Sequence, residues 1–254
     1  MLKARLIPIL LLKNERMVKP IQFGAGGERD VGWPVTTAKI YNSQDADELV
    51  FLDVNATNSD RSFLLDTLKK VAEHCFVPLT AGGGIKTTED IREILRAGAD
   101  KVSINTVAVE NPNFIREAAD IFGRQCIIVS IDALEVEHGK YVVCTHGGKT
   151  KTNRDVVEWA KEVAKFGAGE ILLTSIDREG TMKGYDINLV RSVADAVSIP
   201  VIANGGAGNR AHFVDVIREG HASAVAASSV FHFSDSNIPQ VKLFINNSSI
   251  PIRC

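Results

Sequence analysis

The stretch Val77-Pro78-Leu79-Thr80-Ala81-Gly82-Gly83-Gly84 joins a short apolar run to three consecutive glycines. An apolar run such as residues 77–81, ending at a turn signal, is typical of a buried parallel strand. A helical pattern follows, in which Thr87 is a suitable cap and Ile91 and Ile94 share one face. The stretch therefore predicts a strand, a glycine turn and a helix in direct succession.

The same alternation extends over the whole chain. The apolar runs that we interpret as strands are 5–12, 48–54, 77–81, 101–104, 126–131, 171–174, 200–203 and 222–226. Amphipathic helical patterns lie between most of them, and eight such units over about 250 residues predict a (β/α)₈ barrel. A doubly wound open sheet is the alternative, but it usually has fewer strands. We expect one α/β domain over residues 1–254, with a polar, frayed tail over about 246–254.

An internal repeat supports this architecture. The segment Ala81-Gly82-Gly83-Gly84 resembles Ala203-Asn204-Gly205-Gly206 at an offset of 122 residues. The same offset carries Asn105 to Ala227, directly beside Ser228. Two similar half-barrels of four units each explain the shared offset, whereas chance similarity between glycine-rich turns is the alternative.

Composition excludes several classes of protein. The 254 residues are 45% hydrophobic and 24% charged, with 29 basic and 31 acidic residues and a net charge of −2. Such a chain can bury a large core, which excludes a disordered protein. A nearly neutral chain is not expected to bind nucleic acid or an anionic membrane surface.

The cysteines and the N-terminal segment indicate where the chain works. The four cysteines (Cys75, Cys126, Cys144 and Cys254) are scattered, without a CxxC pair or a neighbouring histidine, so we expect reduced thiols and neither a metal nor a cofactor. The apolar run 6–12 is too short for a membrane helix and lacks a cleavage site for a signal peptide. We therefore expect a cytoplasmic protein.

Glycines and polar residues follow the predicted strands in both halves. In such barrels the functional groups lie at the carboxyl ends of the strands. Glycines there let backbone N–H groups approach an anion, and neighbouring polar side chains add donors. Each half therefore predicts one phosphate site, formed by Gly83, Gly84, Asn105 and Thr106 in the first half and by Gly205, Gly206 and Ser228 in the second, with Ser229 as a further donor. The alternative is that the glycines serve only tight turns.

Asp132 ends the fifth predicted strand, where a carboxylate can act as a general acid or base. Its counterpart in the first half is Leu11, which cannot transfer a proton. We expect Leu11 and Asp132 to face each other across the barrel top. Asp53 and Asp177 also lie at strand ends, where each could equally cap a loop.

Four charged residues stand at or just before strand starts, at the opposite end of the barrel: Arg5, Glu48, Lys101 and Glu170. They are either solvated strand ends or a ring across the barrel bottom. Because buried charges must pair, a ring of two bases and two acids would close the barrel axis with salt bridges.

These motifs together resemble the cyclase subunit of imidazole glycerol phosphate synthase. The resemblance runs from Met1 to about Phe233, and its specific motifs are residues 48–53, 82–85, 98–106, 169–178 and 230–233. It implies a (β/α)₈ barrel whose glutaminase partner docks at the barrel bottom and releases ammonia from glutamine. The ammonia passes through the barrel to the top, where a bisphosphorylated ribulosyl formimino aminoimidazole carboxamide ribonucleotide is cleaved and cyclised, a lyase-type reaction.

The resemblance also implies roles for individual residues. It makes Arg5, Glu48, Lys101 and Glu170 the ammonia gate, and Lys19 the lysine of a flexible first loop. It places phosphate contacts near Gly84, Asn105 and Thr106, and near Gly180, Gly206 and Ser228.

The sequence departs from this family at the catalytic pair. The family uses two aspartates, and Asp132 matches one whereas Leu11 occupies the position of the other. Losing a general acid or base typically lowers the rate by about 10²–10⁴. The stretch Leu10-Leu11-Leu12-Lys13-Asn14 resembles a branch associated with surface-polysaccharide biosynthesis, which works with a glutaminase and a separate sugar amide ligase to form an acetamidino group on a nucleotide-linked sugar.

Three functions therefore remain open. The first is a synthase subunit that receives ammonia for amidation of a surface-polysaccharide sugar, and the second is a cyclase subunit in histidine biosynthesis. The third is a scaffold that binds and activates the glutaminase without catalysis. The gate charges are present while one catalytic aspartate is missing, which favours the first or third function over the second. The glycine loops predict a phosphorylated small-molecule ligand.

Overall fold

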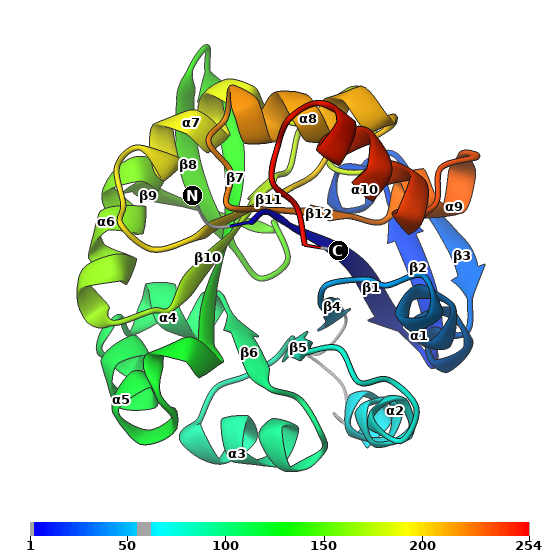
Figure 1. Cartoon of the computed structure of the whole chain (residues 1–254). Coiled ribbons are helices and arrows are strands. Elements are labelled where there is room, and N and C mark those ends of the chain that lie inside the picture. The colour runs from blue at the N-terminus through cyan, green and yellow to red at the C-terminus, as the bar shows by residue number, and fades with distance from the viewer. Residues whose placement is uncertain (1–2, 55–61, 254) are drawn as a thin grey trace.

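The computed structural model describes residues 3–54 and 62–253. Within these residues, parallel strands pair in a closed circle (Figure 1). In order round the circle they are β1 (Arg5–Lys13), β4 (Leu49–Asp53), β5 (Leu79–Gly82), β6 (Lys101–Ile104), β7 (Ile127–Glu137), β10 (Glu170–Ser175), β11 (Val201–Asn204) and β12 (Ala224–Ala227), which pairs with β1 again. Each corresponds to a predicted strand, and the (β/α)₈ barrel is confirmed.

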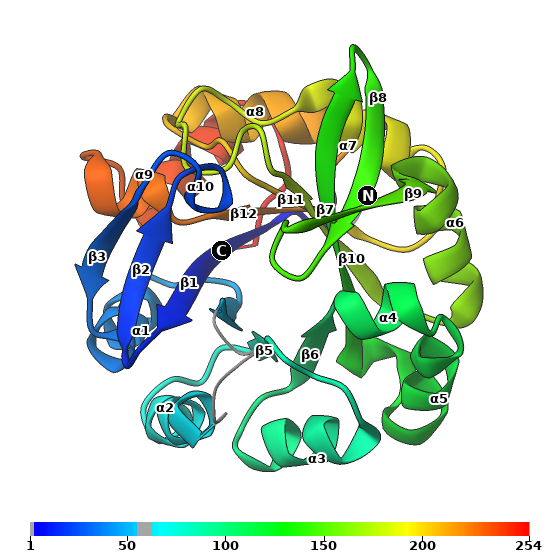
Figure 2. The same ribbon diagram turned by 180° about the vertical axis from the view of Figure 1, so that it is seen from behind.

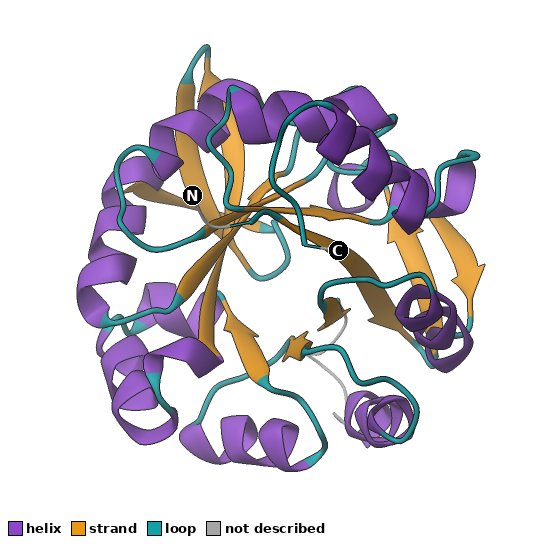
Figure 3. Ribbon diagram, in the orientation of Figure 1, coloured by secondary structure: helices purple, strands orange, loops and turns teal. Residues whose placement is uncertain are grey.

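Helices form the outer layer of the barrel (Figure 3). They are α1 (Pro34–Ser43), α2 (Ser62–Ala72), α3 (Thr88–Arg96), α4 (Thr106–Glu110), α5 (Asn113–Phe122), α6 (Val156–Phe166), α7 (Ile187–Ala194), α8 (Arg210–Arg218), α9 (Ser229–Phe233) and α10 (Ile238–Asn247). The predicted cap of α3 is present, because the Thr87 and Asp90 side chains exchange hydrogen bonds with the first turn. In the described part of the chain, no helix has the length and apolar character needed to cross a bilayer.

Alternation along β1 separates two hydrophobic clusters. Leu6, Leu10 and Leu12 pack in the large cluster beneath the helices, whereas Ile7 and Ile9 pack in a smaller one inside the barrel. A strand that is buried on both faces reads as a continuous apolar run, which is why the sequence identified the barrel strands.

Two strands of the barrel continue into antiparallel extensions at its carboxyl end. β1 is followed by β2 (Arg16–Pro20) and β3 (Glu28–Gly32), and a short 3₁₀ turn, Gln22–Gly24, lies between them. β7 is followed by β8 (Lys140–Thr145) and β9 (Thr150–Asp155). Figure 2 shows both extensions from the opposite side to Figure 1. The sequence did not predict these four strands, because their exposed faces carry polar residues instead of an apolar run.

The internal repeat is visible in the backbone. β6 leads through Asn105 into the five-residue helix α4, and β12 leads through Ser228 into the five-residue helix α9. The backbone angles of the two connecting residues are similar, with φ −128° and ψ −80° at Asn105 and φ −135° and ψ −64° at Ser228.

The expected frayed tail is not what the structure shows. Helix α10 continues to Asn247, and Ile252 then pairs with Ala4 beside the start of β1. The Ala4 N–H donates to the Pro251 carbonyl at 2.8 Å, and Ile252 is only 2% exposed. Burial of the apolar residues Ile250 and Ile252 orders this segment in spite of the polar residues before it. Cys254 lies outside the described residues.

Candidate functional site

The four charged residues at the amino ends of the strands form a closed ring. The Arg5 guanidinium contacts Glu48 at 2.5 Å and also pairs with Glu170. The Lys101 ammonium contacts the same two carboxylates, at 3.1 Å for Glu48 and 2.6 Å for Glu170. Each cation therefore bridges both acids, and the ring form of the sequence prediction is confirmed over the solvated one.

Burial and charge act in opposite directions on this ring. Burial alone would lower the pKa of Arg5, but the Glu170 and Glu48 carboxylates raise it overall. Burial alone would raise the pKa of Glu170, but Arg5 and Lys101 hold it below its usual range. Both shifts favour the charged forms of Arg5 and Glu170 at neutral pH, and the ring combines two basic with two acidic side chains.

The barrel interior above the ring is mostly apolar, with two hydroxyl groups on neighbouring strands. Ile7, Val50 and Leu172 belong to the interior hydrophobic cluster. On β5 and β6, the hydroxyl groups of Thr80 and Ser103 are buried without a hydrogen-bond partner among the described residues. Unpaired buried hydroxyls favour a small polar molecule in their vicinity.

Asp132 lies on β7 at the opposite end of the barrel, next to Thr174 of β10. Its carboxylate is buried and accepts a hydrogen bond of 2.8 Å from the Asn105 amide. Burial raises the pKa of Asp132 to about 7, although hydrogen bonds from Asn105 and Ser130 oppose the shift. A carboxyl group with this pKa can take or give a proton near neutral pH.

Leu11 lies on β1 and is aligned with Leu52 of β4. Both side chains are partly buried and pack on the interior cluster. β1 and β7 are four strands apart in either direction round the circle, so Leu11 and Asp132 lie on opposite sides of the barrel, at the carboxyl end, as expected. The top of the barrel thus presents a carboxyl group on one side and an apolar surface on the other.

The other two aspartates at strand ends differ from Asp132. Asp177 accepts a hydrogen bond of 2.9 Å from the Glu135 N–H, so it connects the loop after β10 to the extension of β7. This is the loop-capping alternative. Asp53 ends β4, and its backbone and Cβ lie directly against Gly83.

Two of the predicted phosphate residues of the first half, Asn105 and Thr106, are hydrogen-bonded to the extension of β7. The Asn105 amide donates to Asp132 and, at 3.2 Å, to the Cys144 carbonyl. The Thr106 hydroxyl accepts a hydrogen bond of 3.0 Å from the His146 N–H. Gly83 has a φ of +114° and its counterpart Gly205 has a φ of +96°, conformations that favour glycine and make the two turns alike.

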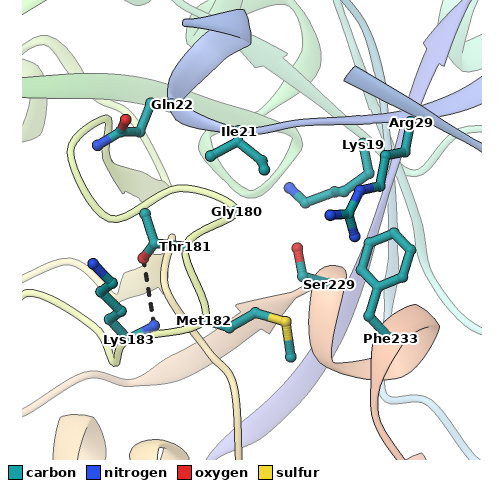
Figure 4. Close-up of a pocket in the computed structure, with 10 residues that line it drawn as sticks. All are labelled: Lys19, Ile21, Gln22, Arg29, Gly180, Thr181, Met182, Lys183, Ser229 and Phe233. Atoms are coloured by element: carbon teal, nitrogen blue, oxygen red, sulfur yellow. Dashed lines mark hydrogen bonds between the residues drawn. The ribbon is translucent and has the colours of Figure 1, made fainter. Parts of the chain in front are cut away.

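A pocket of about 430 Å³ lies between the second half of the barrel and the β2–β3 extension of the first half, as Figure 4 shows. Its cationic side chains come from separate segments: Lys19 from β2, Arg29 from β3 and Lys183 from the loop after β10. Gly180 and Ser229 also line it, and the Ser229 hydroxyl is buried without a partner among the described residues. Three cations and a buried hydroxyl suit an anionic group such as phosphate.

The pocket contains some of the residues that the sequence singled out. Lys19 and Gly180 line it, whereas Ser228, Gly205 and Gly206 lie in the adjoining segments rather than in its lining. Arg29 and Lys183 were missed, because no local pattern marks them. Arg29 also stacks over the Phe233 ring, 5.0 Å from the ring centroid, so β3 is held against α9.

Lys19 is more deeply buried than a lysine in a flexible loop would be. Its side chain forms an ion pair with Glu179, in the loop after β10. Burial lowers the pKa of Lys19 to about 7, while the neighbouring carboxylate favours the charged ammonium. Glu179 was not predicted as a site residue.

Comparison with known families agrees with this geometry. The family model described as histidine biosynthesis protein matches residues 5–237, from the first residue of β1 to the residue before α10. The match covers the whole barrel, including the ring at its base and Asp132 at its top. The chain therefore belongs to the histidine biosynthesis protein family of isomerases and cyclases.

Proposed function

We propose that this chain is the synthase subunit of a glutamine amidotransferase complex in the cytoplasm. A glutaminase docks at the barrel bottom and delivers ammonia through the barrel, and the ammonia is used to amidate a surface-polysaccharide sugar, together with a sugar amide ligase. The ligand at the barrel top is a phosphorylated small molecule. The family match supports cyclase-like synthase chemistry, and the features below support the narrower assignment.

The closed ring of charges carries this proposal. The ring consists of salt bridges among Arg5, Glu48, Lys101 and Glu170. It lies at the amino end of the barrel, whereas Asp132 lies at the carboxyl end. The hydroxyls of Thr80 and Ser103 lie above the ring and are buried without a partner among the described residues. A ring that can open, followed by weakly polar groups, suits the passage of a small neutral molecule such as ammonia.

The residues at the barrel top favour a reaction different from that of a cyclase with two catalytic aspartates. Asp132 retains a proton-transfer group with a pKa of about 7. Opposite it, Leu11 and Leu52 present only hydrocarbon. A reaction that needs proton transfer on both sides of its substrate would lose one of the two groups here, whereas transfer of ammonia to an acceptor can proceed with one.

A cyclase subunit of histidine biosynthesis is the second candidate. The family match favours it, and so does Asp132, whose environment suits proton transfer near neutral pH. The pocket beneath β2 and β3 would hold one phosphate of the bisphosphorylated substrate in either case.

The deciding experiment is turnover of the bisphosphorylated histidine-pathway substrate with an ammonium salt as the nitrogen source. We expect a rate about 10²–10⁴ lower than that of a cyclase with both aspartates. Leu11→Asp should raise it. Leu52→Asp is the matched control, because it places the same carboxyl group one strand away in the same layer. Ordinary turnover by the unmodified chain would establish the histidine-pathway function instead.

A second assay addresses the glutaminase. The glutaminase subunit of an imidazole glycerol phosphate synthase is mixed with this chain, and glutamine hydrolysis is followed. We expect hydrolysis to rise with the unmodified chain and to rise equally with Asp132→Asn, because the interaction is at the barrel bottom. Stimulation without transfer of nitrogen to any phosphorylated acceptor would favour the non-catalytic scaffold. No stimulation would count against docking of that subunit.

A further inference from the structure

The extension formed by β2 and β3 lies at the carboxyl end of the barrel, beside β1, and the turn between its strands contacts the loop after β10. The Gln22 N–H donates to the Glu179 carbonyl at 2.9 Å, and the Gln22 side-chain amide donates to the Asp177 carbonyl at the same distance. The backbones also approach closely, since a Cβ on Gly180 would lie 2.7 Å from the Pro20 carbonyl oxygen. Only glycine permits this approach, so the loop is shaped to receive the extension.

The extension also contacts two other parts of the barrel mouth. The Phe23 ring lies against Gly148, in the turn between β8 and β9, where an added Cβ would be 2.6 Å from Cδ2. Arg29 stacks on Phe233 of α9. These contacts come from the far side of the barrel and from the last barrel unit, and the extension supplies one wall of the pocket through Lys19, Ile21, Gln22 and Arg29 (Figure 4).

The Lys19–Glu179 ion pair is the charged contact at the centre of this arrangement. Lys19 is 3% exposed and Glu179 is 6% exposed, and the two are 160 positions apart in the chain. Removing one partner of such a pair leaves a buried charge without compensation, which is strongly unfavourable. The pair therefore resists separation of the extension from the barrel much more than an exposed pair would.

Lys19 also lines the pocket, together with Arg29 and Lys183. One ammonium group thus faces two possible anions, the Glu179 carboxylate and a phosphate group in the pocket. The buried Ser229 hydroxyl, which has no partner among the described residues, points to the same ligand.

We propose that Glu179 is a positioning residue that latches the β2–β3 extension over the pocket through Lys19, and that an entering phosphate group takes the Lys19 ammonium over from Glu179. The latch stands on the contacts alone. The exchange of partners rests on the phosphorylated ligand of the proposed function, but not on the ammonia path or the glutaminase.

Hydrogen exchange of the full-length protein tests both parts. Backbone exchange of residues 14–32 is measured for the unmodified chain and for Glu179→Gln. Glu28→Gln is the matched control, because it neutralises an exposed ion pair, Lys13–Glu28, on the same extension. We expect exchange at least about tenfold faster in Glu179→Gln and within about twofold in Glu28→Gln, because only the first pair is buried. Unchanged exchange of the barrel strands shows that the fold is intact.

Inorganic phosphate is then added to each variant. We expect it to restore slow exchange in Glu179→Gln, because phosphate replaces the carboxylate as the partner of Lys19, and to have no such effect when Lys19→Met is added. Equal exchange in Glu179→Gln and Glu28→Gln would overturn the latch. Two results would overturn the change of partner. In the first, phosphate does not slow exchange in Glu179→Gln; in the second, phosphate slows exchange equally when Lys19→Met is also present. If Glu179→Gln does not fold, Glu179→Asp, which keeps the charge one methylene further from Lys19, should show an intermediate rate, and a rate equal to the unmodified chain would refute the latch.

Discussion

Replacing Arg5 by methionine removes one of the two cations from the ring at the barrel bottom. The Arg5 side chain is 9% exposed, and it gives three hydrogen bonds to Glu48 and Glu170. Methionine keeps much of the apolar volume but leaves two buried carboxylates facing the single ammonium of Lys101. The change therefore tests how strongly charge balance holds the barrel closed.

The expected loss of stability follows from this geometry. Breaking a buried ion pair by removing one partner costs about 3–5 kcal/mol. Lys101 still bridges both carboxylates, at 3.1 Å and 2.6 Å, so the lower end of that range applies, about 3 kcal/mol. In a chain of this size, a loss of about 3 kcal/mol lowers the melting temperature by roughly 6–12 °C.

Urea unfolding at several pH values is the assay. The folded pKa of Glu170 lies below its usual range, so its contribution to stability is present above the unfolded pKa and is lost as the pH falls through the folded value. The difference between the unmodified chain and Arg5→Met should therefore be largest above about pH 5 and should shrink well below about pH 4, where unfolded glutamates are protonated. Adding Glu170→Gln to Arg5→Met restores the charge balance and should recover part of the loss.

Arg16→Met is the matched control, because Arg16 forms an exposed ion pair with Asp30 at 3.0 Å. Its effect should stay below about 1 kcal/mol. A loss of less than about 1 kcal/mol in Arg5→Met, or an equal loss at pH 3 and pH 7, would refute the view that the ring is a balanced buried network.

Two further predictions concern Asp132 and the end of the chain. Because the folded pKa of Asp132 is about 7 and its unfolded value is near 4, the native state holds a proton that the unfolded state loses between these values, and stability falls as the pH rises through this window. Asp132→Asn should remove this pH dependence. The variant should be about 2–4 kcal/mol more stable than the unmodified chain at pH 8 and about equally stable at pH 4. Equal stability differences in urea unfolding at the two pH values would contradict this prediction. Ile252→Ala should lower the free energy of unfolding by about 2–4 kcal/mol in the same assay, because Ile252 is buried beside Ala4. The control Leu243→Ala, at an exposed position of α10, should change it little. Equal effects would mean that the pairing with Ala4 contributes nothing to stability.

The barrel was predictable because its strands are buried on both faces. Such strands leave continuous apolar runs, and β6 has the same ends in the sequence and in the structure. The ring was predictable only as one of two alternatives, because a charged residue at a strand start can point inward or outward. In the structure, side chains alternate between the two faces of β1, and Arg5 lies on the inward face with Ile7 and Ile9.

The pocket was not predictable from local patterns. Lys19 lies beside Arg29 and reaches Glu179 only because β2 and β3 form an antiparallel extension next to the loop after β10, and those strands are short and largely polar. Contacts between positions 160 apart leave no periodic signal in a single sequence. The glycine turns were predictable, because a positive φ restricts the residue type wherever the chain lies.

The amide of Asn105 connects two chemical events that were treated separately above. It donates to the buried carboxylate of Asp132, and its backbone begins the segment predicted to bind phosphate. A phosphate that drew this amide away would remove a hydrogen bond that stabilises the ionised carboxylate, so Asp132 would bind a proton more tightly. Ligand binding and proton uptake are then thermodynamically linked, and by reciprocity the ligand binds more strongly as the pH falls through 7. In this way, loading of the barrel top with its ligand would itself set the protonation state of its acid.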